Sequence, residues 1–156
     1  MSEAPKPEWW FYHLSRTTLE QAAAPLMQKC LDVGWRVLAV SPSVERRAAL
    51  DASLWTFDEK TFLPHGQAEA PGLDPARQPI LLSDTCEAAN RASACILADG
   101  QWRPETLAQD RFERVFLLFG EDRREAARTA WRDVSAKDDL ERSFYEQREG
   151  RWVKVA

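Results

Sequence analysis

Apolar positions in this chain form two kinds of pattern that alternate from the N-terminus to the C-terminus. Short apolar runs, the first of them rich in aromatic residues, predict strands at 8–14, 36–40, 79–83, 94–98 and 114–119. Helical spacing between these runs predicts helices at 19–33, 44–57, 103–111 and 121–137. The last segments, 142–147 and 151–155, flank Glu149-Gly150 and predict a terminal hairpin or two edge strands.

Residues with special backbone preferences mark the ends of the first predicted helix. Thr17 and Thr18 are good N-cap residues, and Gly34 is suited to end the helix. Pro25 lies inside the helical pattern, so it should either kink the first turns or mark the start of the regular helix. Proline and glycine recur between 58 and 79 without periodicity, which predicts a long surface loop, and residues 1–7 are expected to form a disordered tail.

The alternation of strands and helices predicts an α/β fold, a sandwich of helices on a mainly parallel sheet with antiparallel C-terminal edge strands. The 156 residues fit a single domain, and 44% hydrophobic with 29% charged residues is typical of a globular protein. No apolar run approaches the ~20 residues of a membrane span. The first residues lack the basic and apolar regions of a signal peptide, so we expect a cytoplasmic protein that does not contact membranes.

Charge and cysteine usage remove several classes of function. Lys and Arg total 21 against 25 Asp and Glu, a net charge of −4, so the chain lacks the basic excess of a general nucleic-acid binder. Cys30, Cys86 and Cys95 show no Cys-x-x-Cys spacing, and only His13 and His65 could assist them. We therefore expect neither a disulfide nor a metal site.

Motifs for cofactor binding and catalysis are weak. The sequence contains neither Gly-x-Gly-x-x-Gly nor a P-loop, and the turn at 14–18 carries bulky side chains where a pyrophosphate would need backbone. Ser83 and Asp84, with a histidine, could suggest a hydrolase, but no Gly-x-Ser-x-Gly elbow is present and a turn explains the pair better. We expect no cofactor and no catalysis, with a nucleotide-binding enzyme as the rival class.

The helix predicted after Gly120 carries the main functional signal. Its small residues share one side, which predicts the core face, and they are Ala126, Ala127, Ala130 and Val134. Another side gathers cations around an indole, namely Arg124, Arg128, Trp131 and Arg132. Two explanations stay open: a solvated face whose arginine stems cover the ring, or a cationic groove with an aromatic wall for a carboxylate beside an apolar side chain. Direct binding of single-stranded nucleic acid by this stripe is a third hypothesis.

A second unusual stretch runs from Leu54 to His65. It places Trp55, Phe57 and Phe62 between a helix end and a Pro-rich loop. These residues either complete the core beneath the loop or form an exposed apolar patch typical of a protein interface.

Short motifs in order along most of the chain resemble the chi subunit of bacterial DNA polymerase III holoenzyme, an accessory protein of the clamp-loader complex. The matching segments are Phe11-Tyr12-His13-Leu14, Gly34-Trp35-Arg36-Val37-Leu38, Leu50 to Trp55, Phe62-Leu63-Pro64-His65 and Ala127 to Arg132. The resemblance implies a Rossmann-like three-layer domain without catalytic activity. Its implied partner is the acidic C-terminal tail of single-stranded-DNA-binding protein, so that DNA is reached only indirectly.

The resemblance also implies roles for individual residues. Arg128 would grip the terminal carboxylate of the tail, Leu117 and Trp131 would line the pocket for its last side chain, and Arg124 and Arg132 would attract its aspartates. A second implied surface, around Phe62 with Trp55 and Pro64 nearby, would dock the psi subunit or another clamp-loader component. The loop at 66–78 departs from the family pattern.

Overall fold

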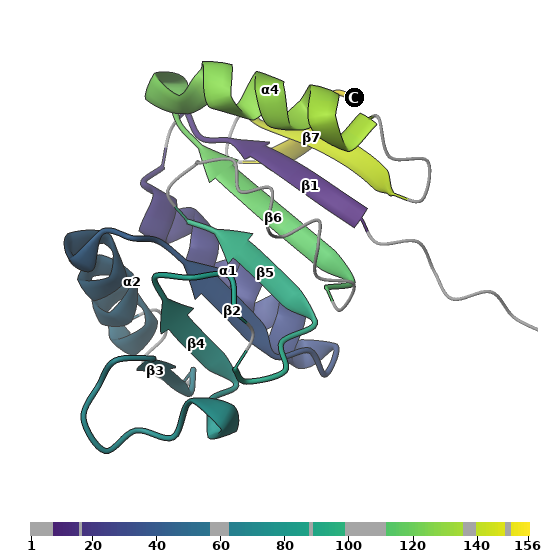
Figure 1. Ribbon diagram of the computed structural model, residues 1–156. Helices are drawn as coiled ribbons and strands as arrows, with labels where there is room; N and C mark the ends of the chain where they lie inside the picture. Colours follow the sequence, from purple (N-terminus) through teal and green to yellow (C-terminus); the bar gives the residue numbers. More distant parts are fainter. Residues whose placement is uncertain are drawn as a thin grey trace, which may run out of the picture.

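The computed structural model describes residues 8–15, 17–56, 63–87, 89–98, 112–135, 140–148 and 151–156. Its strands form one sheet in the order β3-β4-β2-β5-β6-β1-β7-β8 (Figure 1). Neighbouring strands are parallel except for the last pair, β7 and β8, which is antiparallel. The strands are β1 (Glu8–His13), β2 (Val37–Val40), β3 (His65–Gln67), β4 (Ile80–Ser83), β5 (Ala94–Leu97), β6 (Arg114–Phe119), β7 (Glu141–Arg148) and β8 (Arg151–Lys154).

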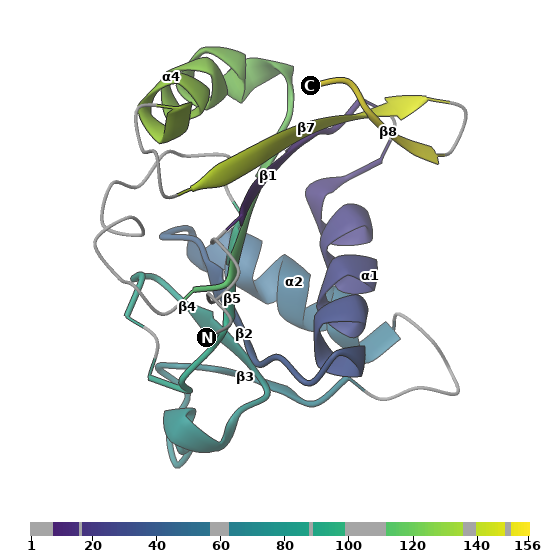
Figure 2. The same cartoon turned by 90° about the vertical axis from the view of Figure 1, so that its right-hand side faces the viewer.

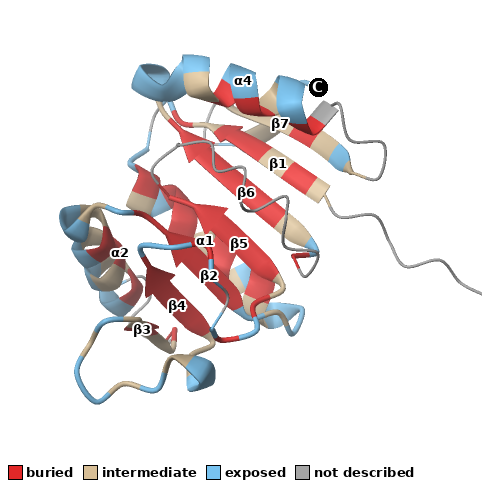
Figure 3. Cartoon of the chain, in the orientation of Figure 1, coloured by how far each residue is buried: buried red, intermediate tan, exposed pale blue. Residues whose placement is uncertain are grey.

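Helices cover both faces of this sheet. α1 (Leu19–Asp32) and α2 (Val44–Thr56) lie on one face, and α4 (Arg124–Ser135) lies on the other (Figure 2). The predicted fold class, a three-layer α/β fold with a mainly parallel sheet and antiparallel C-terminal strands, is confirmed. The central strands β2, β4 and β5 are buried along their whole length (Figure 3), as their continuous apolar sequences require.

Side chains of β1 alternate between two hydrophobic cores. Trp9 and Phe11 belong to the core under α4, whereas Tyr12 belongs to the core under α1 and α2, with Trp10 packed against it. In register, Phe11 of β1 lies between Leu117 of β6 and Phe144 of β7, so these three residues share the α4 face.

Helix α1 shows how local sequence sets the ends of an element. Thr18 and Gln21 form a capping box at its start. At its end the Gly34 N–H donates to the Leu31 carbonyl and the Trp35 N–H to the Cys30 carbonyl, the Schellman arrangement, with Gly34 at φ 87°. Pro25 lies inside the helix, so the alternative in which it marks the helix start is wrong. The capping box, whose N-cap Thr18 lies seven residues before Pro25, decides where the helix begins.

Two predicted boundaries need correction. The segment 58–79 is not loop throughout, because β3 forms at His65–Gln67 and a 3-10 turn, η1, forms at Pro75–Arg77. β3 is three residues long with a glycine at its centre, too short to show a strand pattern in the sequence. The helix predicted at 121–137 begins with a 3-10 turn, η2 (Glu121–Arg123), before α4. The helix predicted at 103–111 and the tail at 1–7 lie outside the described residues.

Three further expectations concern chemistry and membranes. Cys30, Cys86 and Cys95 are all buried thiols. In the part of the chain that the structure describes, no group of three or more His, Cys, Asp and Glu residues could hold a metal ion. Within the same residues, no helix combines the length and the apolar character that crossing a bilayer requires.

Candidate functional site

Helix α4 presents the predicted small-residue face to the sheet. Ala127, Ala130 and Val134 are at most 1% exposed and belong to the core on this side, while Ala126 is half-buried. Small side chains let the helix axis lie close to β1, β6 and β7. The opposite side of α4 is therefore held at the surface, above the outer strands of the sheet (Figure 1).

The arginines of α4 are exposed, and two of them are only loosely paired. Arg124 lies 3.7 Å from a carboxylate oxygen of Glu121, and Arg128 lies 3.4 Å from one of Glu125. The Arg128 side chain is 57% exposed and that of Glu125 85%. Surface pairs of this kind contribute about 0–1 kcal/mol, so an incoming carboxylate can replace Glu125 at little cost. Arg132 is also exposed.

Trp131 is half-buried and rigidly held. Its ring meets Phe11 edge-on at 5.2 Å between centroids and Phe144 at 5.8 Å. The guanidinium carbon of Arg142, from β7, lies 3.9 Å from the centroid of the Trp131 ring, and Arg142 donates a hydrogen bond to the Trp131 carbonyl at 2.5 Å. The indole is therefore a fixed wall rather than a ring free in solvent.

Beside this wall lies a surface groove of about 430 Å³, the α4 groove. Its lining residues come from α4 and from the C-terminal strands, namely Glu125, Arg128, Trp131, Arg132, Phe144 and Ala156. Cations therefore flank an aromatic wall, and this arrangement suits a carboxylate next to an apolar side chain. Of the two explanations for the stripe, the groove describes its geometry better than a uniformly solvated face.

Leu117 needs a correction. Its side chain is fully buried (0% exposed) in the core beneath α4 and does not line the α4 groove. Two strands away in the same register, Phe144 provides the apolar surface instead. Sequence reasoning also missed Arg142. The one available signal for both is that 142, 144 and 146 share a strand face, but only the pairing with β1 shows which face that is.

The second predicted surface lies at the end of α2. Trp55 is 61% exposed and its ring meets His65 edge-on at 5.3 Å, while Pro64 is half-buried. Leu54 and Leu63 beside them are buried. Trp55 is therefore a surface residue rather than part of the core, and Phe62 lies outside the described residues.

Two comparisons with known proteins bear on this site. The family model described as "DNA polymerase III chi subunit, HolC" matches residues 7–139, most of the chain. The chain belongs to this family. A curated protein of Rickettsia prowazekii (strain Madrid E), "Probable DNA polymerase III subunit chi", is 31% identical over 86 residues. That alignment covers 55% of this chain and about half (51%) of the relative. The resemblance to the chi family is thereby confirmed.

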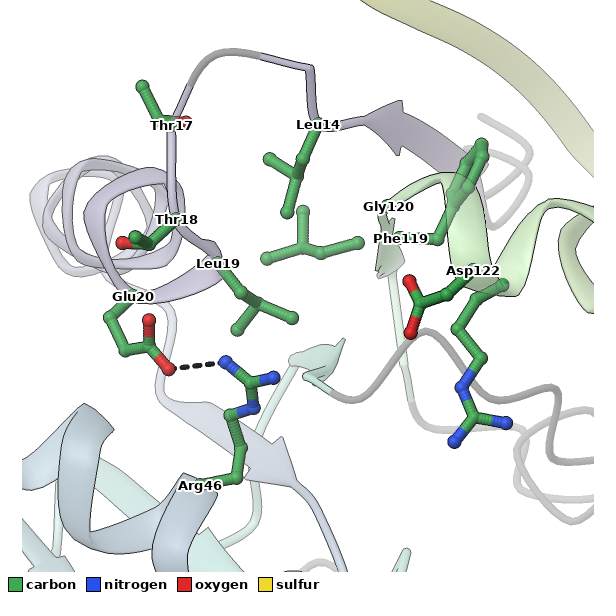
Figure 4. A pocket seen from close by; sticks show the side chains of 11 residues that line it. Leu14, Thr17, Thr18, Leu19, Glu20, Arg46, Phe119, Gly120 and Asp122 are labelled. Atoms are coloured by element: carbon green, nitrogen blue, oxygen red, sulfur yellow. Dashed lines mark hydrogen bonds and ion pairs between the residues drawn. The ribbon is translucent and has the colours of Figure 1, made fainter.

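In this member of the chi family, the carboxyl ends of β1 and β6 form the place where α/β sheets usually hold nucleotides. After β1 the chain turns to α1 on one face, and after the adjacent β6 it turns to α4 on the other, so a switch point lies between them. A pocket of about 340 Å³ lies there (Figure 4), with Arg46 ion-paired to Glu20 and with Asp122 on the opposite wall. Leu14 and Leu19 also line the pocket, and their side chains point into it. Arg123 also lines the pocket, but the carboxylates of Glu20 and Asp122 beside leucine side chains suit a phosphate group poorly.

Two residues considered for the hydrolase alternative have structural partners. Ser83 is buried, and its hydroxyl accepts a hydrogen bond from the Thr85 N–H at 3.2 Å, so it stabilises a turn. His13 contacts a carboxylate oxygen of Glu121 at 2.8 Å and stacks on Phe119. Each residue thus has a structural partner of its own.

Proposed function

We propose that this chain is a non-catalytic accessory subunit of DNA polymerase III that binds the acidic C-terminal tail of single-stranded-DNA-binding protein in the α4 groove. The observation that carries the proposal is the juxtaposition of exposed Arg128 and Arg132 with the fixed ring of Trp131 around one groove. Binding there links the single-strand-coated template to the polymerase in the cytoplasm, without catalysis, cofactor or direct contact with DNA.

Each part of the tail has a matching surface. The terminal carboxylate pairs with the Arg128 guanidinium, which exchanges its loose contact with Glu125 for a charge-assisted one. The last apolar side chain lies against Trp131 and Phe144. Arg124 and Arg132, one turn away on either side of Arg128, attract the aspartates that precede the end of the tail.

The surface around Trp55 is proposed to dock a second component, the psi subunit or another part of the clamp loader. The support is an exposed indole held by His65 beside half-buried Pro64, because a large exposed aromatic residue is a common anchor of interfaces. Phe62 belongs to the same proposal by its place in the sequence.

A peptide-binding measurement tests the main proposal. A fluorescent peptide with the last residues of the tail is titrated with the wild-type chain, with Arg128→Ala and with Trp131→Ala. We expect Arg128→Ala to weaken binding about tenfold, roughly 1.4 kcal/mol, because a charge-assisted contact is lost. Arg123→Ala is the matched control: Arg123 is exposed just before α4 and does not line the groove, so its loss should leave affinity within about twofold.

The rival functions give different results. Equal affinity for the Arg128 and Arg123 variants would remove the α4 groove from the proposal. Binding of an oligonucleotide that Trp131→Ala abolishes, with no binding of the tail peptide, would favour direct recognition of single strands. A thermal shift with nucleotides would favour an enzyme, since ligand at ~100 times its dissociation constant adds ~2.7 kcal/mol.

A further inference from the structure

A second groove, of about 420 Å³, lies on the face of the sheet opposite α4. We call it the α1 groove, because the C-terminal half of α1 forms one side and the strands β1 and β6 form the other. Its main lining residues are Trp10, Tyr12, Lys29, Trp35, Arg114 and Phe116. In Figure 2, α1 and α4 lie on opposite sides of the sheet, so the α1 groove and the α4 groove can be occupied at the same time.

A stacked guanidinium dominates the α1 groove. The guanidinium carbon of Arg114 lies 3.9 Å from the ring centroid of Trp10 and 5.2 Å from that of Trp35. Glu8 neutralises this arginine through an ion pair. Trp, Tyr and Arg are the residues that most often dominate protein interfaces, and here they gather in one concave surface.

The end of α1 builds the rim of the groove. Gly34 in the left-handed conformation closes the Schellman arrangement, which turns the chain so that Trp35 lies near Arg114. The same turn leaves Val33 64% exposed beside the groove. Lys29, one turn earlier on α1, is exposed at the edge. An apolar side chain and a cation therefore stand next to the aromatic lining.

Two buried hydrogen-bond donors in this groove have no acceptor. They are the indole Nε1 of Trp10 and the Nε of Arg114. Neither nitrogen is exposed to solvent, so bulk water does not satisfy it, and an unpaired buried donor is costly. Because an atom that water cannot reach is closed to a ligand oxygen as well, these two donors do not bind an occupant, and Lys29 is the exposed cation that can meet a carboxylate.

We propose that the α1 groove docks an internal acidic segment of a partner protein, in which one apolar side chain is flanked by carboxylates. The apolar side chain lies against the rings of Trp10 and Trp35, and a flanking carboxylate meets Lys29 at the edge of the groove. A strand of nucleic acid fits less well, because the groove offers one exposed cation, its arginine is already neutralised by Glu8, and the chain carries a net charge of −4. This site goes beyond the proposed tail-binding function and does not rest on it.

The indole N–H signals of the protein test this directly by NMR. The probe is acetyl-Asp-Asp-Phe-Asp-Asp-amide, which has no free terminal carboxylate. We expect the Trp10 and Trp35 signals, assigned with Trp→Phe variants, to shift in a saturable way by about 5 mM peptide. The shifts should persist in Arg128→Ala, whose α4 groove has lost a cation, so failure of this site and failure of the tail site are separate results.

Charge reversal supplies the matched pair of variants. Lys29→Glu should weaken peptide binding about tenfold. Lys154 is also exposed and lies on β8 outside the groove, so Lys154→Glu should leave binding within about twofold. Indole signals that stay fixed, or an equal loss in both variants, overturn the proposal. The proposal is also overturned if an oligothymidylate of about 15 nucleotides shifts the Trp10 and Trp35 indole signals and the peptide does not. The groove is then a nucleic-acid site.

Discussion

The two grooves place arginine beside tryptophan in opposite ways. In the α4 groove the Arg128 side chain is 57% exposed and reaches into solvent next to Trp131. In the α1 groove the Arg114 side chain is 23% exposed and lies between Trp10 and Trp35. The same two residue types therefore give a surface that can exchange ionic partners in one case and a pre-formed aromatic wall in the other. Burial, rather than composition, separates the two.

The difference extends to the partners of each arginine. Arg128 has a distant, exposed glutamate that a ligand can displace, whereas Arg114 is held by Glu8 and by two rings. We therefore expect the α4 groove to depend on charge and on salt, and the α1 groove to depend on apolar contact and on the exclusion of water. The four predictions below test that contrast.

The largest effect concerns the hydrophobic cores that lie on the two sides of the sheet. Leu117 and Leu118 are neighbours on β6, both fully buried, and they belong to the α4-side and α1-side cores respectively. Leu117→Ala and Leu118→Ala should each lower the free energy of unfolding by about 2–5 kcal/mol, measured by urea denaturation. Tail-peptide affinity of the folded Leu117→Ala protein should stay within about twofold. A tenfold loss for Leu117→Ala but not for Leu118→Ala would show that Leu117 contacts the ligand.

The second prediction tests whether water is excluded from the interior of the α1 groove, where the Cys30 thiol lies. Burial raises the pKa of the Cys30 thiol from 9.0 to about 11, with the charge of Arg114 acting in the opposite direction. Between pH 9 and pH 11 the Cys30 thiol therefore keeps its proton in the native state and loses it in the unfolded chain. The contribution of this thiol to the free energy of unfolding is fully present below pH 9. It is lost as the pH rises through 11, by at most about 3 kcal/mol.

Urea denaturation at pH 8, 9, 10 and 11 measures the slope of the free energy of unfolding against pH. Cys30→Ala should flatten it between pH 9 and 11. A residual slope should remain at the upper end, because burial also raises the pKa of Tyr12. An unchanged slope in Cys30→Ala would mean that the thiol is accessible to water and that the α1 groove is wetter than its lining indicates.

The third prediction tests whether an arginine stacked on tryptophan is also needed for ligand binding in the α4 groove. Arg142 covers the Trp131 ring and donates to its carbonyl, so Arg142→Ala should release the indole. We expect tail-peptide affinity to fall about fivefold, roughly 1 kcal/mol, and Arg142→Lys to recover only part of it because an ammonium lacks the planar stack. Arg148→Ala, on the same face of β7 and exposed, is the control. Equal affinities for Arg142→Ala and Arg148→Ala would leave Arg142 without a positioning role.

Much of the α4 side could be predicted from the sequence, because a helix encodes its faces locally. Spacing at 3.6 residues per turn was enough to place Ala127, Ala130 and Val134 inside and Arg124 and Arg128 outside. The strand–helix alternation likewise predicted the layers of the fold. Family resemblance then suggests the ligand that we propose for the α4 groove, which the residues alone leave open.

The contributions of the sheet could not be predicted in the same way. Leu117 was assigned to the pocket although it lies in the core, and Phe144 and Arg142 were missed, because the register of β7 against β1 is a long-range property. The α1 groove was missed for the same reason. Trp10, Trp35 and Arg114 are far apart in the sequence, and only the pairing of β1 with β6 brings Arg114 beside Trp10.

The smallest effect compares the response of the two grooves to salt. Raising NaCl from about 0.05 to about 0.5 M shortens the screening length to a few Å, so exposed charge pairs weaken while apolar contacts do not. Tail-peptide affinity for the α4 groove should fall about threefold, and affinity of the blocked acidic peptide for the α1 groove should change less. Both are measured on one sample through the Trp131 and Trp10 indole signals. A steeper salt dependence at Trp10 than at Trp131 would reverse the contrast, because it would mean that Lys29 attracts the ligand more strongly than the rings do.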